Sequence, residues 1–269
     1  MLWTKKYAKA FELGFQIALE YRANFLLSLL SAAYPIVIQV FMWSAIYASS
    51  AEGVVYGYTY RQMLTYTFLA GLVARIVRTG FEYDIMEDIK GGKFSLFLVQ
   101  PLGYFPYRLF SYLGQKLPNL GMILLILALV LAGLWIFQIV TLGIGALLAF
   151  LLTLALAVVL NFLIFYCFSA VAFWIIEIGF LFEGIRIVTI LLSGGIFPLE
   201  VFGERFVQVT SLLPFKYTVS YPISVLNGTL GPFEVAQGML VQCFWIAVCW
   251  GLATYLWRVG GRRYVAVGG

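Results

Sequence analysis

The stretch 117-LPNLGMILLILALVLAGLWIFQIVTLGIGALLAFLLTLALAVVLNFLIFYCFSAVAFWII-176 contains no charged residue. A transmembrane helix needs about 20 predominantly apolar residues, so this stretch is long enough to cross a lipid bilayer twice. We expect the turn between the two crossings at residues 135–141. The stretch therefore predicts an all-α integral membrane protein.

The composition of the whole chain supports this interpretation. Of its 269 residues, 63% are hydrophobic and 11% are charged, whereas soluble domains carry about 25% charged residues. Burying so much apolar surface in one aqueous domain would need a larger interior than this length supplies. We therefore treat residues 1–269 as a single transmembrane domain.

The residue types that most enzymes need are scarce in this chain. It has no histidine, the commonest general base and metal ligand. Its three cysteines form no CxxC pair, so neither a metal site nor a disulfide scaffold is expected. Paired carboxylates are also missing from the middle of the apolar runs. We expect no catalytic residue, no metal site and no contact with nucleic acid.

Four further uncharged runs bring the expected number of transmembrane helices to six. We place spans 1 and 2 in residues 24–80, spans 3 to 5 in residues 117–199, and span 6 in residues 235–258. The fifth span, a short apolar run at 187–199, is the least regular.

Lys and Arg residues are distributed unevenly about these spans. If the N-terminus is cytoplasmic, all but three of the 17 basic residues fall on the cytoplasmic side; the exceptions are Arg61, Arg205 and Lys216. Cytoplasmic loops are the ones that carry excess positive charge. We therefore expect a multi-pass protein of the cell inner (plasma) membrane with both termini in the cytoplasm.

Four segments lie outside the expected spans. Residues 1–22 have apolar side chains at helical spacing, which is typical of an amphipathic helix in the membrane interface. Residues 81–116 are expected to be a cytoplasmic segment. Residues 200–234 contain several prolines and are expected to form a short extracellular re-entrant hairpin. Residues 259–269 would form a cytoplasmic tail.

The segment 81–116 is the largest hydrophilic part of the sequence. Its acidic residues precede the pair Gly91-Gly92, which predicts a short helix with a glycine cap at its C-terminus. Ile85 and Ile89 would give this helix an exposed apolar face able to dock against a protein; a solvated loop is the alternative. The charged residues of this candidate docking site are Glu82, Asp84, Glu87, Asp88 and Lys90.

Residues 192-LSGG-195 match four of the five letters of the LSGGQ signature of ABC-type ATPases. The fifth residue is Ile196, and the chain contains no GxxxxGK[ST] loop for binding phosphates. We interpret the match as accidental. Small residues at this position would instead let the helix end and the backbone pack closely.

The chain resembles the membrane subunits of ABC-2-type transporters along nearly its whole length. The motifs that carry the resemblance, in addition to the N-terminal helix and the six spans, are 87-EDIKGGK-93, 98-LVQP-101, 193-SGGIFP-198 and 213-LPFKY-217. Because no ATPase domain is present, the resemblance is to the split form, in which permease and ATPase are separate chains.

This resemblance implies a division of work between subunits. A partner ABC ATPase would bind ATP and Mg²⁺, and this chain would hold no cofactor. The helix at residues 82–91 would couple the ATPase to the membrane domain. A second permease, identical or paralogous, would complete the substrate path along spans 2 and 5. The cargo is expected to be hydrophobic, amphipathic or cationic.

Charged residues close to lipid are costly and are therefore candidates for function. Glu177, Glu183 and Arg186 are expected at the inner end of span 5, where they could form a gate or simply mark the membrane boundary. Phe197 and Phe202 are candidates for the gate or substrate path. A stand-alone secondary transporter or channel is the alternative function, although we find no convincing internal repeat.

Overall fold

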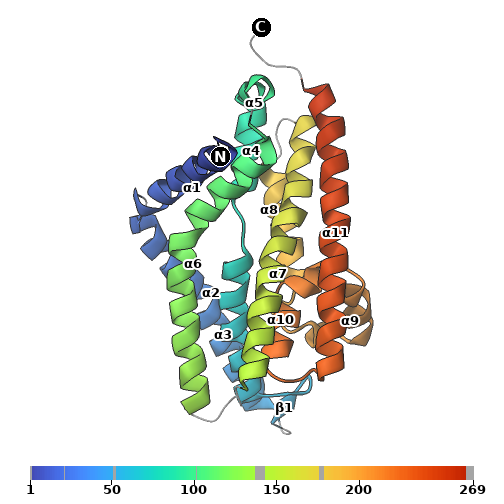
Figure 1. The fold of residues 1–269 in the computed structure, drawn as a ribbon. Helices are drawn as coiled ribbons and strands as arrows, with labels where there is room; N and C mark the ends of the chain where they lie inside the picture. Colours follow the sequence, from blue (N-terminus) through green and yellow to red (C-terminus); the bar gives the residue numbers. More distant parts are fainter. Residues whose placement is uncertain are drawn as a thin grey trace.

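The computed structural model describes residues 2–20, 22–50, 53–100, 102–136, 143–175 and 179–264. They form a bundle of helices (Figure 1). The helices are α1 (Leu2–Glu20), α2 (Arg22–Ser49), α3 (Tyr60–Val77), α4 (Phe81–Lys90), α5 (Phe94–Val99), α6 (Tyr104–Ile136), α7 (Ile144–Ser169), α8 (Gly179–Leu192), α9 (Glu204–Ser211), α10 (Ser220–Leu226) and α11 (Pro232–Arg263). The shorter elements are the 3-10 turns η1 (Ala170–Phe173), η2 (Leu199–Phe202) and η3 (Phe215–Thr218), and the strands β1 (Val54–Val55) and β2 (Tyr58–Thr59).

Three helices in the described part of the chain are long and apolar enough to cross a membrane. They are α6, α7 together with η1, and α11. They correspond to the expected spans 3, 4 and 6, and α11 packs along α7 (Figure 1). The prediction of an all-α integral membrane protein is confirmed. The expected turn between spans 3 and 4 lies mostly outside the described residues, but α6 ends at Ile136 and α7 begins at Ile144.

Helices α2, α3 and α8 occupy the positions of the expected spans 1, 2 and 5. Helix α2 has 28 residues, and its portion Ala33–Ser49 is apolar. The 18 residues of α3 and the 14 residues of α8 extend about 27 Å and about 21 Å, whereas the hydrocarbon core of a bilayer is about 30 Å thick. The count of six spans therefore stays a prediction.

Helix α6 is longer than the predicted span 3. It begins at Tyr104, so residues 104–116, which we expect in the cytoplasmic segment, form one continuous helix with span 3. Pro118 lies inside this helix. Proline cannot donate the helical hydrogen bond and bends the helices that contain it, and Figure 1 shows α6 changing direction along its length.

A helix, α1, is present where the N-terminal amphipathic helix was predicted, and it packs against the first half of α6 (Figure 1). Its place in the membrane interface stays a prediction. Tyr7 and Ala10 are buried in this contact. The two backbones touch where Gly14 meets Gly114: a Cβ on Gly14 would collide with the Ser111 carbonyl oxygen, and a Cβ on Gly114 with the Phe11 carbonyl oxygen. Small residues are what allow two helices to approach so closely.

The two ends of the bundle carry different elements. At one end lie α4, α5, the start of α1 and the end of α11; we call it the α4 end (Figure 1). At the opposite end, the hairpin end, β1 and β2 pair in the register Val55–Tyr58 around a two-residue turn. Tyr56 and Gly57 both have positive φ there, as a type I′ turn requires. Thr59, the last residue of β2, caps α3 in a capping box with Gln62.

The segment 200–234 forms helices rather than an irregular loop. Helix α9 lies on the outside of the bundle, whereas α10 is almost completely buried against α7 and α3. A helical pair before the last span is therefore present, and its re-entry into the membrane stays a prediction. The last helix begins at Pro232 and continues to Arg263, past the predicted end of span 6 at residue 258.

Buried side-chain amides satisfy backbone carbonyls between helices. Asn161 donates to the carbonyl of Val77, the last residue of α3, over 2.8 Å. The Gln242 amide donates to the carbonyls of Thr153, over 3.0 Å, and Tyr217, over 2.9 Å. Lipid offers no hydrogen bonds, so such polar groups must be satisfied within the protein. These bonds fix the end of α3 and hold α11 against α7 and η3.

Candidate functional site

The short hydrophilic helix expected at residues 82–91 is α4, and its glycine cap is present. The Gly91 N–H donates to the Glu87 carbonyl over 2.8 Å. Gly92 follows with φ +76, a left-handed conformation that glycine adopts at little cost. The helix therefore ends at Lys90 for the reason that the sequence indicated.

The apolar face of α4 corrects the sequence interpretation. We expected Ile85 and Ile89 to be exposed for docking, but the two side chains are only 0% and 7% exposed. They belong to a core cluster that includes Phe81 and Phe162. The face is apolar because it packs α4 against α7 of the same chain.

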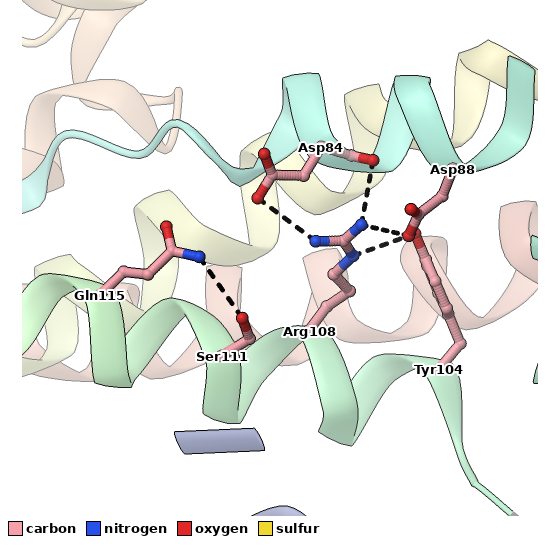
Figure 2. Close-up of polar contacts among 6 residues, drawn as sticks. All are labelled: Asp84, Asp88, Tyr104, Arg108, Ser111 and Gln115. Carbon is pink, nitrogen blue, oxygen red and sulfur yellow. Dashed lines mark hydrogen bonds and ion pairs between the residues drawn. The ribbon is translucent and has the colours of Figure 1, made fainter. Parts of the chain in front are cut away.

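Arg108 of α6 anchors one side of α4 (Figure 2). It donates to the Asp84 carbonyl over 3.0 Å, pairs with the Asp84 carboxylate over 3.3 Å, and forms an ion pair with Asp88. The Tyr104 hydroxyl donates to the same Asp88 carboxylate over 2.8 Å. Burial raises the pKa of Asp84, and the nearby Arg108 opposes that shift. The acids at positions 84 and 88 thus hold α4 on α6.

Arg186 of α8 anchors the other side of α4. Its guanidinium donates to the Glu82 carboxylate over 2.6 Å, and the Glu82 side chain is completely buried. Glu183 lies 3.9 Å from Arg186 and accepts a hydrogen bond from Tyr83 of α4. Burial and this bond to Glu183 raise the pKa of Tyr83 to about 12. Glu177, the third charged residue predicted in this region, lies outside the described residues.

Only part of the predicted docking site is exposed at the surface of the chain. Glu87 and Lys90 are exposed on α4, and Lys93 follows them. The neighbouring α5 exposes Leu98 and Val99, the latter by 81%. This mixed charged and apolar surface lies at the α4 end of the bundle (Figure 1). We call Glu87, Lys90, Lys93, Leu98 and Val99 the α4–α5 surface.

The predicted gate residues Phe197 and Phe202 lie toward the hairpin end. Phe197 packs edge-on against Trp43 of α2, with ring centroids 5.9 Å apart, and its ring lies 6.4 Å from that of Phe202. Before them, α8 ends at Leu192. Gly194 follows with φ +75, and its carbonyl accepts a hydrogen bond from Tyr66 of α3 over 2.7 Å.

The LSGG stretch therefore has a structural role at this position. A Cβ on Gly194 would lie 2.6 Å from the Tyr66 hydroxyl oxygen. The glycine allows α8 to end and α3 to approach, as we inferred from the sequence.

Two cavities lie beside α3. The first has a volume of about 450 Å³ and lies between α2, α3, α7 and α8; we call it the four-helix cavity. The second has a volume of about 370 Å³ and lies between the α4 end of α3 and α6; we call it the α3–α6 cavity. Both are lined by Arg75, Arg78 and Thr79.

The sequence did not identify the partners of the α4 acids. Arg108 is the clearest omission. The available signal was a single arginine among the aromatic residues of 104–112, in the segment that follows the acidic helix. No short-range sequence pattern links this arginine to positions 84 and 88. Among the described residues there is no group of three or more His, Cys, Asp or Glu that could hold a metal ion.

Comparison with known proteins gives one match. A family described as "ABC-2 family transporter protein" matches residues 33–268, which is most of the chain. No curated protein and no solved structure matches it.

Proposed function

The chain belongs to the ABC-2 family of transporter proteins, and we propose that it is the permease subunit of an ATP-driven exporter. It contains no phosphate-binding loop of its own, so a separate ABC ATPase would bind ATP and Mg²⁺. Two permeases, identical or paralogous, would form the substrate path. On this proposal the α4 end of the bundle faces the cytoplasm of the cell.

The observation that carries the proposal is the position of α4. One side of this helix is exposed as part of the α4–α5 surface, and the other side is ion-paired to α6 through Arg108 and to α8 through Arg186. A partner that moves the exposed side would therefore move α6 and α8 as well. This arrangement suits a coupling helix.

The contacts with the ATPase belong to the exposed residues. Glu87 and Lys90 would make the charged contacts, and Leu98 and Val99 of α5 the apolar ones. Glu82, Asp84, Asp88, Ile85 and Ile89 would support the helix from within the permease. This division follows from burial: a fully buried carboxylate such as Glu82 cannot reach a second protein without first leaving its arginine.

The opposite end of α8 leads to the proposed outer gate. Helix α8 carries Arg186 in its middle and is followed by Gly194, which accepts a hydrogen bond from Tyr66, and then by Phe197, which packs on Trp43. A shift of α8 imposed through Glu82 would therefore move Phe197 relative to α2. The cargo is hydrophobic or amphipathic on this proposal; three arginines lining the four-helix cavity disfavour a cationic one.

Charge reversal on the α4–α5 surface tests the coupling contact. The double variant Glu87→Lys/Lys90→Glu should greatly reduce co-purification with the partner ATPase, while its thermal unfolding midpoint stays unchanged because neither residue is buried. Glu204→Lys is the matched control, since Glu204 is exposed on α9, away from the α4 end. Undiminished co-purification of the double variant would show that the ATPase binds elsewhere.

A further inference from the structure

The two cavities beside α3 meet at a basic corner. Arg75, Arg78 and Thr79 line both of them, and Lys116 of α6 lines the α3–α6 cavity. No Asp or Glu is among the described residues that line either cavity. Positive charge without acidic wall residues attracts an anion, most strongly where the surroundings exclude water.

The charges at this corner differ in how far they are neutralised. Arg186, at the edge of the four-helix cavity, is paired with Glu82. Lys116 is different: its ammonium donates to the Arg78 carbonyl over 3.1 Å and to the Tyr112 hydroxyl. Both acceptors are neutral, so neither of them is an acidic partner for Lys116. Arg78 itself is exposed at the α4 end of α3.

Polar atoms in the wall of the four-helix cavity have no partner in the described part of the chain. They are Gln39 Oε1, Thr79 Oγ1 and Thr189 Oγ1, all buried and without a hydrogen bond there. Buried polar atoms in proteins are nearly always hydrogen-bonded. Three such atoms around one cavity indicate a polar occupant, and hydroxyl groups can donate to an anionic oxygen.

The rest of the wall is apolar. Ile36, Phe165, Ile190 and Ile196 are among the apolar residues that line the four-helix cavity. The volume of about 450 Å³ lies within the range of about 300–1,000 Å³ typical of small-molecule sites. The cavity is therefore an apolar chamber with a basic corner at the α4 end of α3.

We propose that this chamber binds an amphipathic anion: an apolar chain among the isoleucines, and a phosphate or carboxylate head group at Arg75 and Arg78, next to Lys116 of the adjoining α3–α6 cavity. If the chain exports a cargo as proposed above, that cargo would be an amphipathic anion of this kind. This last step rests on the proposed function. The binding itself does not depend on the ATPase.

Binding can be measured on the purified chain alone in dodecyl maltoside. Dodecyl phosphate, added at low mole fraction, should raise the thermal unfolding midpoint in a saturable manner, because a ligand that binds the folded state stabilises it. Dodecyltrimethylammonium, with the same tail and opposite charge, should not, and inorganic phosphate should act far more weakly. Equal effects of the two amphiphiles would overturn the proposal. Equal effects of inorganic phosphate and dodecyl phosphate would show that the apolar chain does not contribute to binding, which would also contradict the proposal.

Variants locate the site. Arg78→Gln should weaken dodecyl phosphate binding by about tenfold, since it removes charge-assisted hydrogen bonds to the head group, and Lys116→Gln should act in the same direction. Arg61→Gln, at the other end of α3 and outside both cavities, is the matched control. Arg78 is exposed, so this variant should fold normally. Unchanged affinity in Arg78→Gln would place the anion elsewhere and overturn the assignment.

These outcomes can be separated from those of the proposed function. The binding experiment contains neither ATPase nor ATP, so its failure would leave co-purification with the ATPase untouched. Conversely, loss of the ATPase partner would not affect the dodecyl phosphate titration.

Discussion

Arg186 of α8 donates to Glu82 of α4 over 2.6 Å, although the two residues are 104 positions apart in the sequence. The carboxylate is completely buried, and the arginine side chain is 19% exposed. Together with Arg108, this pair fixes the buried side of α4 to α6 and α8. The stability of this part of the chain therefore depends on ion pairs between largely buried side chains.

Breaking the pair on one side should strongly destabilise the protein. Arg186→Gln leaves the Glu82 carboxylate buried and unpaired, and removing one partner of a buried ion pair costs about 3–5 kcal/mol. The thermal unfolding midpoint of the purified chain should fall clearly below that of the parent.

The double variant Glu82→Gln/Arg186→Gln provides the control for this prediction. It removes both charges, so it should be more stable than Arg186→Gln alone. If the double variant were less stable than the single variant, the two residues would not act as a pair.

Opposite effects are expected for two glycines of α6. Gly114→Ala introduces a Cβ that collides with the Phe11 carbonyl oxygen, and such overpacking costs about 1–3 kcal/mol. A Cβ on Gly121 would meet nothing within 4 Å, so Gly121→Ala should be neutral or stabilising because alanine favours the helix. Differential scanning fluorimetry can compare the two midpoints.

Release of α1 should accompany the Gly114→Ala change. Lys5, Lys6 and Lys9 are exposed on α1, and trypsin should cleave there faster once the helix no longer packs on α6. If the rate of tryptic cleavage and the unfolding midpoint were the same in Gly114→Ala and Gly121→Ala, the close contact between the backbones of α1 and α6 would be refuted.

Tyr66 and Gly194 should be energetically coupled. Gly194→Ala forces a side chain into a left-handed conformation, at about 1–2 kcal/mol, and directs its Cβ at the Tyr66 hydroxyl. Tyr66→Phe removes that hydroxyl, so the double variant should be more stable than the sum of the single effects predicts. A double-mutant cycle measures this coupling, with Gly251→Ala as the control because a Cβ there meets nothing within 4 Å. Strict additivity would contradict the contact.

The sequence predicted the features that depend on local pattern. The uncharged stretch 117–176 identified α6 and α7 because lipid requires long apolar runs. Gly91-Gly92 identified the end of α4, and the helical spacing of apolar residues in 1–22 identified the helix α1, although not its packing against α6. Each of these features is determined by residues within a few helical turns of one another.

The sequence could not identify the partners across the bundle. Arg108 and Arg186 meet the acids of α4 only because α6 and α8 converge on it, and no local pattern encodes that convergence. The acidic residues of α4 consequently looked like a surface for a partner, whereas Glu82 and Asp88 are buried inside the chain. The short α8 was similarly hidden, because the apolar run 187–199 does not reveal where the helix begins.

The most direct test of the central claim is purification of the tagged chain from its native membranes in a mild detergent, followed by mass spectrometry and an ATP hydrolysis assay. We predict a co-purifying chain that carries a GxxxxGK[ST] loop and an LSGGQ motif, with hydrolysis in the eluate that disappears when that chain is deleted. If the protein instead purified without any nucleotide-binding chain and transported dodecyl phosphate uphill on its own after reconstitution, the account would be contradicted.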